Sequence, residues 1–175
     1  MRTLAEIDRK KLVGMLADRL AFERAAAARY RAVLPELRGA EPAVLRIVPR
    51  LEQQLVEEED HARWLEAELT RLEAPLELVR APAERGQRDC DALFGDRGGS
   101  VIELVSALHR LELGDLEGWD LLVAVAERAG DEPARRELGL RRGEEARHVE
   151  YLHRVLVELA VNHALGHPVT LPAAP

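Results

Sequence analysis

The sequence is poor in cysteine, in aromatic residues and in long apolar runs. Its single cysteine, Cys90, excludes an intrachain disulfide and a Cys-x-x-Cys metal site. Aromatic residues make up 3% of the 175 residues, and no apolar run approaches the roughly 18 residues that a membrane span requires. The first residues, MRTLAEIDRKK, lack the apolar core of a signal peptide. We therefore expect a cytoplasmic protein with no membrane partner.

The sequence also lacks a surplus of basic residues. Its formal net charge is −7, and the basic residues are interspersed with acidic ones, which gives no reason to expect a nucleic-acid partner. Apolar residues make up 47% and charged residues 33% of the chain, with abundant Ala, Leu, Glu and Arg. This composition predicts an all-α protein, and the length suits one domain with a hydrophobic core.

Hydrophobic periodicity and the positions of Pro and Gly predict four long helices, joined in pairs by short loops. The predicted helices cover roughly residues 4–34, 43–73, 100–129 and 134–164. Between the second and third helices, residues 74–99 contain two prolines and a Gly-Gly pair, and we interpret them as a long crossover with room for one short helix. We therefore predict one four-helix domain, residues 1–164, built from two helical hairpins and followed by a C-terminal tail, residues 165–175.

Two Glu-x-x-His pairs lie on the apolar sides of the second and fourth predicted helices. They are Glu58/His61 and Glu145/His148. Residues three apart project from one face of a helix, so each pair can bind a metal ion, and two such pairs facing each other can bind two. Charged groups on an apolar face are costly to bury unless they are paired or bound to metal. A third pair, Glu150/His153, is rotated about 140° from Glu145, and we interpret it as a chance pair that faces solvent.

A lone glutamate interrupts the apolar face of each remaining helix. Glu23 is the only charge that we place on the apolar face of the first helix, and Glu112 lies on that of the third. The halves repeat each other, because Tyr30 follows Glu23 by seven positions and Trp119 follows Glu112 by seven. Either glutamate alone is explained equally well as a boundary residue whose carboxylate reaches water. Six potential ligands on four apolar faces, in a duplicated pattern, favour a metal site between the helices.

This pattern resembles that of the ferritin-like di-iron carboxylate superfamily, to which rubrerythrins and bacterioferritins belong, over residues 10–160. The resemblance depends on Glu23, Glu58-x-x-His61, Glu112 and Glu145-x-x-His148, in that order. It implies a ferritin-like four-helix bundle that binds two iron ions, with a Mn/Fe pair as an alternative, bridged by Glu58 and Glu145. The remaining ligands would divide between the two ions as Glu23 with His61 and Glu112 with His148.

The resemblance also implies roles for two residues beside the ligands. Tyr30 matches the family tyrosine that hydrogen-bonds a metal carboxylate of the neighbouring half, although a core tyrosine with any other partner is an equal alternative. Asp115, one turn after Glu112, resembles the extra third-helix carboxylate of rubrerythrins, with a hydrogen-bonding or exposed role as the alternative. His109, one turn before Glu112, we interpret as a partnered histidine rather than a ligand.

The chain departs from the family in three places. It has no Cys-rich rubredoxin module, so electrons would come from an external donor. No methionine lies near Glu58, so no haem is expected. The tail is too short and too rich in proline for the fifth helix of ferritin cages, so we expect a homodimer rather than a 24-subunit cage. Gly114 and Gly118 interrupt the third helix, and either close packing against Ala25–Ala28 or a π-bulge would explain them.

Four glutamates and two histidines suit iron or manganese better than structural zinc. We therefore predict a di-iron oxidoreductase of ferroxidase or peroxidase type, which oxidises Fe(II) or reduces O2 or H2O2 and depends on an external electron donor or Fe(II) supply. Two alternatives remain open: a di-iron oxygenase acting on an organic substrate, and a metal-free helical scaffold or cargo protein. The sequence does not identify the physiological oxidant, the electron donor or any organic substrate.

Overall fold

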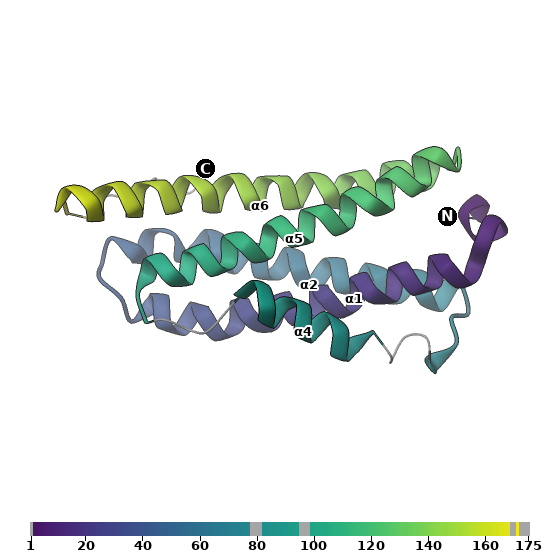
Figure 1. Ribbon diagram of the computed structural model, residues 1–175, viewed down its shortest axis with the longest axis horizontal. Helices are drawn as coiled ribbons and strands as arrows, with labels where there is room; N and C mark the ends of the chain where they lie inside the picture. Colours follow the sequence, from purple (N-terminus) through teal and green to yellow (C-terminus); the bar gives the residue numbers. More distant parts are fainter. Residues whose placement is uncertain (1, 78–81, 95–98, 169–170, 172–175) are drawn as a thin grey trace.

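The computed structural model describes residues 2–77, 82–94, 99–168 and 171, and within these ranges all regular structure is helical. The elements are α1 (Arg2–Arg38), the short 3₁₀ helix η1 (Val44–Arg46), α2 (Val48–Arg71), α4 (Ala83–Phe94), α5 (Val101–Arg128) and α6 (Glu132–Leu165). The four long helices lie along one axis, with α1 and α2 forming one antiparallel hairpin and α5 and α6 the other (Figure 1). The prediction of an all-α bundle of two hairpins is confirmed.

The segment between the hairpins runs from the end of α2 back to the start of α5 at the opposite end of the bundle, so α2 and α5 are parallel (Figure 1). It contains the short helix α4, which packs against α1 and α5. The contact with α1 is close, because a Cβ atom at Gly86 would lie 2.7 Å from Cβ of Ala21. Cys90 is buried there, which raises the pKa of its thiol to about 12 and leaves it largely un-ionised near neutral pH.

Helix α1 differs from its sequence prediction at both ends. It continues through Pro35 to Arg38, where the N–H of Gly39 donates to the carbonyl oxygen of Pro35 at 3.2 Å. It also begins earlier, at Arg2, and is interrupted at Asp8, whose backbone is not helical (φ −157°, ψ 86°). Oδ1 of Asp8 accepts from the N–H of Lys11 at 3.1 Å. Asp8 therefore caps the long straight part of α1.

The second hairpin begins and ends at well-formed caps. Ser100 and Glu103 form a reciprocal capping box at the start of α5. Oδ1 of Asp131 accepts from the N–H of Ala134 at 3.0 Å and caps α6. At the other end of α6, Gly166 has φ 66°, a conformation that glycine adopts without strain. In the tail beyond it, Leu171 is buried in an apolar cluster of the bundle.

The core consists of two apolar clusters, one toward each end of the bundle. One includes residues of α1, α5 and α6 around Leu37, Leu108 and Leu152, and the other surrounds Leu16 and Leu65. Between the clusters lies a layer of buried polar residues from all four long helices. Its members are Arg19, Glu23, Gln54, Glu58, His61, Glu112, Asp115, Glu145 and His148. The clusters exclude water from this layer on two sides, so each of its charges needs a partner inside the protein.

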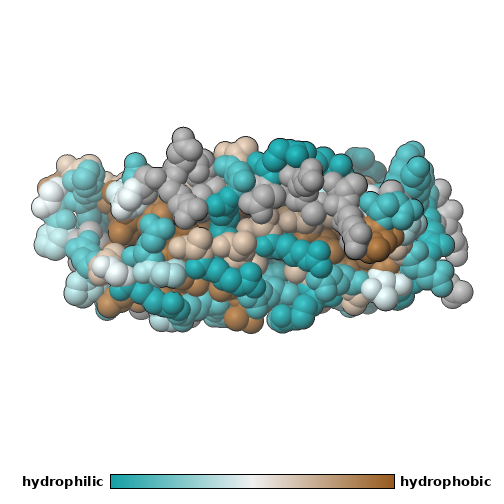
Figure 2. Space-filling model, turned by 90° about the horizontal axis from the view of Figure 1, so that it is seen from below, coloured by the Kyte–Doolittle hydropathy of each residue, from teal (hydrophilic) through white to brown (hydrophobic). Residues whose placement is uncertain are grey.

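The surface on the α4 side is largely hydrophilic, with apolar side chains exposed in separate places (Figure 2). Among the described residues, no helix combines the length and the hydrophobicity needed to cross a membrane.

Candidate metal centre

All six ligand candidates from the sequence meet in the polar layer, and each is at most 1% exposed. They form two overlapping groups of four, in which the potential ligand atoms lie within 4.8 Å of one another. The groups are Glu23, Glu58, His61 and Glu145, and Glu58, Glu112, Glu145 and His148. Glu58 and Glu145 belong to both groups, and each lone glutamate shares a group with a histidine. Each group on its own is close enough together to hold a metal ion.

The donor atoms of the shared carboxylates suit a cation. Both side-chain oxygens of Glu58 and both of Glu145 are buried without a hydrogen-bond partner, as is Oε2 of Glu23. Buried polar atoms in proteins are nearly always satisfied, and an ion is one of the few explanations for a cluster of exceptions. The donor set, carboxylate with imidazole, is one that iron and manganese accept. The residues present therefore fit a site for two divalent metal ions.

Each histidine turns one ring nitrogen toward the cluster and the other away from it. Nδ1 of His61 lies 2.8 Å from Oε1 of Glu145, and Nδ1 of His148 lies 3.2 Å from Oε1 of Glu58. The outward nitrogens reach the residue that precedes the shared glutamate on the other hairpin. Nε2 of His61 lies 2.8 Å from Oε2 of Glu144, and Nε2 of His148 lies 2.5 Å from Oε2 of Glu57. A carboxylate behind a metal-binding histidine fixes its ring and its tautomer.

Glu57 and Glu144 were not predicted from the sequence. The available signal was the doubled acid in each motif, EEEDH and EEARH. One residue corresponds to about 100° of rotation on a helix, so helix periodicity alone places these neighbours away from the direction of Glu58 and Glu145. A long glutamate side chain reaches back from that position. Burial would raise the pKa of Glu57, but its hydrogen bond with His148 lowers it to about 2, so the carboxylate is ionised.

We predict that Glu57→Gln and Glu144→Gln each lower the affinity for Co(II) by about 10- to 100-fold, the usual effect of removing a carboxylate behind a metal-bound histidine. Glutamine keeps the shape but replaces the charged acceptor. The measurement is a competition titration against a chelator. Glu59→Gln is the matched control, because Glu59 also adjoins Glu58 but pairs with Arg31 at the surface. Equal affinities in all three variants would show that the outward contacts do not support the site.

Two aromatic residues connect the halves of the site. The hydroxyl of Tyr30 on α1 donates to Oε1 of Glu112 on α5, and Nε1 of Trp119 on α5 donates to Oε1 of Glu23 on α1 at 2.8 Å. The residue seven positions after each lone glutamate thus holds the lone glutamate of the other half. Burial, followed by the charge of Glu112, raises the pKa of the Tyr30 hydroxyl, so it stays protonated as a donor. Gln54, which also contacts Tyr30 at 3.2 Å, was not anticipated.

Asp115 is fully buried but belongs to neither four-residue group. It pairs instead with Arg19, whose Nη2 lies 3.0 Å from its Oδ1 and whose Nη1 donates to its carbonyl oxygen at 3.2 Å. Nε of Arg19 lies 3.1 Å from Oε1 of Glu23. The structure therefore corrects the sequence analysis, because Glu23 is not the only charge on the inner side of α1. The position of Arg19, one helical turn before Glu23, was the feature of the sequence that could have predicted that its side chain lies on the inner side of α1.

The same arginine explains why residue 118 is a glycine. A Cβ atom at this position would overlap Nη1 of Arg19, so only glycine leaves room for the guanidinium over α5. The π-bulge offered from the sequence is not formed, because α5 is α-helical along its length, and the neighbour of Gly118 is Arg19 rather than the Ala25–Ala28 run.

The remaining histidine candidates lie outside both groups. The ring of His109 packs 5.6 Å from that of His153, centroid to centroid, and His153 and Glu150 are exposed. The interpretation of Glu150/His153 as a chance pair on the surface agrees with this exposure.

Without metal, the charges of the site are balanced by protons. Burial, followed by the charge of Glu145, raises the pKa of Glu58, and burial raises that of Glu112 to about 7 although His148 opposes the shift. Burial would lower the pKa of His61, but its bonds to Glu145 and Glu23 raise it to about 11. Burial alone would raise the pKa of Glu145, but the close ion pairs with His148 and His61 lower it. Metal binding must therefore displace protons from this cluster.

Comparisons of the chain with protein-family models, with curated proteins and with solved structures found no match. The class of the protein is therefore defined by its fold and its buried cluster. It is an all-α helical bundle with Glu and His side chains close enough together to hold metal ions.

Proposed function

We propose that the protein is a di-iron oxidoreductase of ferritin-like type, which oxidises Fe(II) and reduces H2O2 or O2. The observation that carries the proposal is the pair of overlapping four-ligand groups that share Glu58 and Glu145. Two ferrous ions held there would supply two electrons, one each, which with two protons are what the reduction of one H2O2 to two water molecules requires. Glu58 and Glu145, which belong to both groups, would hold both ions.

The buried charges favour two divalent ions over one. Four ligand glutamates balance two divalent cations, while the Arg19–Asp115 pair balances itself. A buried site with net charge close to zero avoids the large cost of an uncompensated ion. A single divalent ion would leave two carboxylate charges to be balanced by protons.

The surrounding residues hold the ligands in place for this chemistry. Tyr30 and Trp119 fix the two lone glutamates, and Glu57 and Glu144 fix the two imidazole rings. The ligands are thus positioned before any ion binds, and their rotation during redox change is limited. The apolar clusters on both sides of the site exclude bulk water from it.

The experiment that tests the proposal is anaerobic loading with Fe(II) followed by titration with H2O2. We expect about two Fe(II) bound per chain, and oxidation of both by one equivalent of H2O2. Metal analysis gives the first number and Mössbauer spectroscopy of the oxidised protein follows the second. A protein that binds no Fe(II) above the level of the control Glu58→Ala/Glu145→Ala would overturn the proposal in favour of a scaffold.

We also expect the protein to form a homodimer rather than a cage, because closed two-fold pairing is the commonest soluble assembly. Val157, Val161 and Leu165 lie four residues apart and exposed on α6, and they offer an apolar stripe that a second chain would cover. Light scattering of the purified protein measures the assembly. A particle near 24 subunits would contradict the expectation and make iron storage the leading function.

A further inference from the structure

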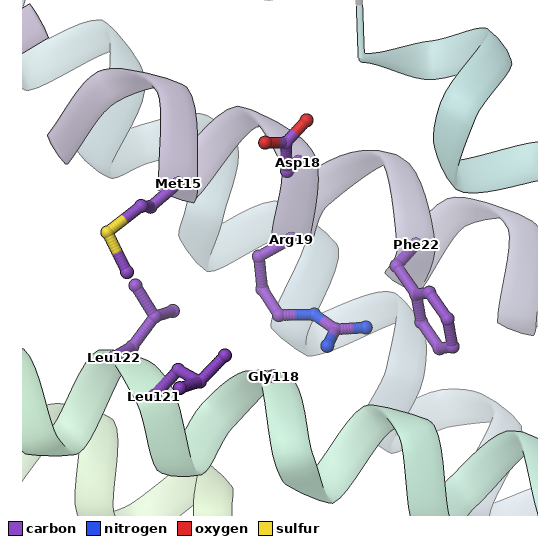
Figure 3. Close-up of a pocket in the computed structure, with 7 residues that line it drawn as sticks. All are labelled: Met15, Asp18, Arg19, Phe22, Gly118, Leu121 and Leu122. Carbon is purple, nitrogen blue, oxygen red and sulfur yellow. The ribbon is translucent and has the colours of Figure 1, made fainter. Parts of the chain in front are cut away.

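A pocket of about 250 Å³ lies between α1 and α5, over the middle of the bundle. Its lining residues are Met15, Asp18, Arg19, Phe22, Gly118, Leu121 and Leu122. Figure 3 shows Arg19 extending from α1 toward Gly118 on α5, between the apolar side chains of the two helices. Asp18 and Leu121 are exposed, whereas Arg19 is 6% exposed. The pocket thus leads from the surface to a buried guanidinium.

This guanidinium lines the pocket and also contacts the candidate metal centre. On the side of the centre, its Nε lies 3.1 Å from the ligand candidate Glu23, and its Nη2 lies 3.0 Å from Asp115. Its Cζ atom lies 4.2 Å from the centroid of the Phe22 ring, a cation–π contact that helps to hold the guanidinium in place. The missing side chain at Gly118 provides the space in which it lies.

The charge and the donors of Arg19 determine what can use this pocket. A guanidinium carries five N–H donors and no acceptor. Nη1 of Arg19 donates to the carbonyl oxygen of Asp115, whereas Nε and Nη2 lie beside Glu23 and Asp115 as ion pairs without a hydrogen bond. Donors therefore remain for a ligand with lone pairs. The charge of the guanidinium is balanced by Asp115 and Glu23, so its remaining N–H donors, rather than a net positive charge, suit a small neutral acceptor or an anion.

The α2–α6 side of the bundle has the opposite character. There, α2 and α6 make little contact. The partly exposed carboxylates of Glu57 and Glu144 contact the outward ring nitrogens of His148 and His61 on this side. Acidic groups in this position favour the approach of a cation. The inner end of the Arg19 pocket thus presents guanidinium donors, and its mouth carries Asp18 paired with Arg85, whereas the α2–α6 side presents carboxylates.

We propose that the Arg19 pocket is the entrance through which a small peroxide, with hydrogen peroxide as the simplest case, reaches the metal centre, and that Arg19 is the residue that admits it. This inference rests on the proposed function, because it requires that metal ions occupy the centre. Arg19 is a positioning residue here: it hydrogen-bonds the incoming oxygen atoms. Asp115 holds Arg19 in place and does not bind metal.

The test compares two tryptophan variants of the full-length chain. Leu121→Trp fills the mouth of the pocket without touching the ligands, and Leu140→Trp is the matched control. The two leucines are similarly exposed, at 57% and 63%, and Leu140 does not line the pocket. Each variant is loaded with Co(II), and the stoichiometry, the affinity and the rate at which azide changes the Co(II) absorption are measured. Oxidation of Fe(II)-loaded protein by H2O2 is followed in parallel by stopped flow.

We expect Leu121→Trp to bind the full complement of Co(II) while azide binding and Fe(II) oxidation slow by at least about tenfold, as for a blocked gate. Leu140→Trp should match the wild type in every measurement. Unchanged rates in Leu121→Trp with full Co(II) would overturn the entrance and leave the proposed function intact. Failure of the wild type to bind Co(II) and Fe(II) would overturn the proposed function itself, so the two failures are distinguishable.

A second variant tests the charge of the gate. Arg19→Met keeps a long apolar stem but removes the guanidinium, and we expect the dissociation constant for azide to rise by about tenfold with the metal content retained. Arg19→Lys should restore part of the azide affinity, because it restores the charge. Azide affinity that is equal in all three proteins would show that Arg19 does not receive the ligand. If Arg19→Met fails to fold, Leu121→Trp still decides the proposal.

Discussion

Replacing Glu58 and Glu145 together by alanine is expected to reduce the bound metal from about two ions per chain to none, because both four-residue groups lose two of their four ligands. Each ion would keep one glutamate and one histidine, which is too few for tight binding of a divalent ion in competition with water. Metal analysis after anaerobic loading with Fe(II) and exchange into metal-free buffer measures the effect.

The double variant also changes the metal-free protein. Glu145 contacts both histidines through its carboxylate oxygens, and its loss removes much of the charge that keeps them protonated. The cavity left by two glutamates adds a further cost. Circular dichroism must therefore show that the helices persist, and Glu58→Gln/Glu145→Gln, which keeps the volume, provides a second test.

Glu150→Ala is the control for this experiment. Glu150 belongs to the third Glu-x-x-His pair of the sequence but lies exposed on α6. The Glu150→Ala variant should bind the same amount of metal as the wild type. Full iron stoichiometry in the Glu58/Glu145 variants, or an equal loss in Glu150→Ala, would show that the shared carboxylates have been assigned wrongly.

The inward-facing residues could be predicted from the sequence because burial leaves a periodic signal. A glutamate or histidine within an apolar face, such as Glu112 or His148, contrasts with its neighbours at helical spacing. The same reasoning separated Glu145 from Glu150, five positions apart. The pairing of the helices followed from loop lengths, because short loops produce antiparallel neighbours and a long crossover does not.

The supporting residues could not be predicted, because they act across helices. Asp115 lies one turn from Glu112, and its sequence position does not say whether it faces a metal or an arginine. The answer depends on Arg19, 96 positions earlier in the chain, and on the lack of a side chain at Gly118. Glu57 and Glu144 were missed for the same reason, since each reaches a histidine on the opposite hairpin. Helix periodicity describes one helix at a time.

Helix ends were the other weak point, because a single side chain can extend or interrupt a helix. Pro35 was predicted to end the first helix, but it costs one backbone hydrogen bond that the packing of Leu34 and Leu37 in the core outweighs. Asp8 interrupts the same helix near its start. Neither difference moves a residue of the metal centre.

The second large effect concerns stability and pH. In the metal-free protein, burial raises the pKa of Glu112 from 4.5 to about 7, so the folded state retains a proton there that the unfolded state loses between these values. Burial alone would lower the pKa of His61, but Glu145 and Glu23 raise it from 6.5 to about 11. His61 therefore stays charged in the folded state at pH values where the histidine of the unfolded chain is neutral. The stabilisation from charged His61 therefore declines between about pH 6.5 and 11, and the ionisation of buried Glu112 destabilises the fold between about pH 4.5 and 7.

Metal binding reverses this dependence. The ion replaces the protons of Glu112 and His61, so its affinity rises as those protons become easier to remove. The stabilisation by a bound ligand grows with its concentration relative to its dissociation constant. We therefore expect the metal-free protein to melt at a lower temperature at pH 8 than at pH 6, and the increase in Tm on adding Co(II) to be larger at pH 8. Calorimetry with and without Co(II) measures both.

Glu112→Gln separates this linkage from other causes of pH dependence. Glutamine does not titrate, so the fall in Tm of the metal-free protein between about pH 4.5 and pH 7, the window set by the two pKa values of Glu112, should be smaller than in the wild type. The part of the fall above pH 7, to which His61 contributes, should remain. A Tm increase on adding Co(II) that is the same at pH 6 and pH 8 would mean that the ion binds without displacing protons. That result would place it outside the buried cluster, because Glu58 and both histidines carry protons there in the metal-free protein.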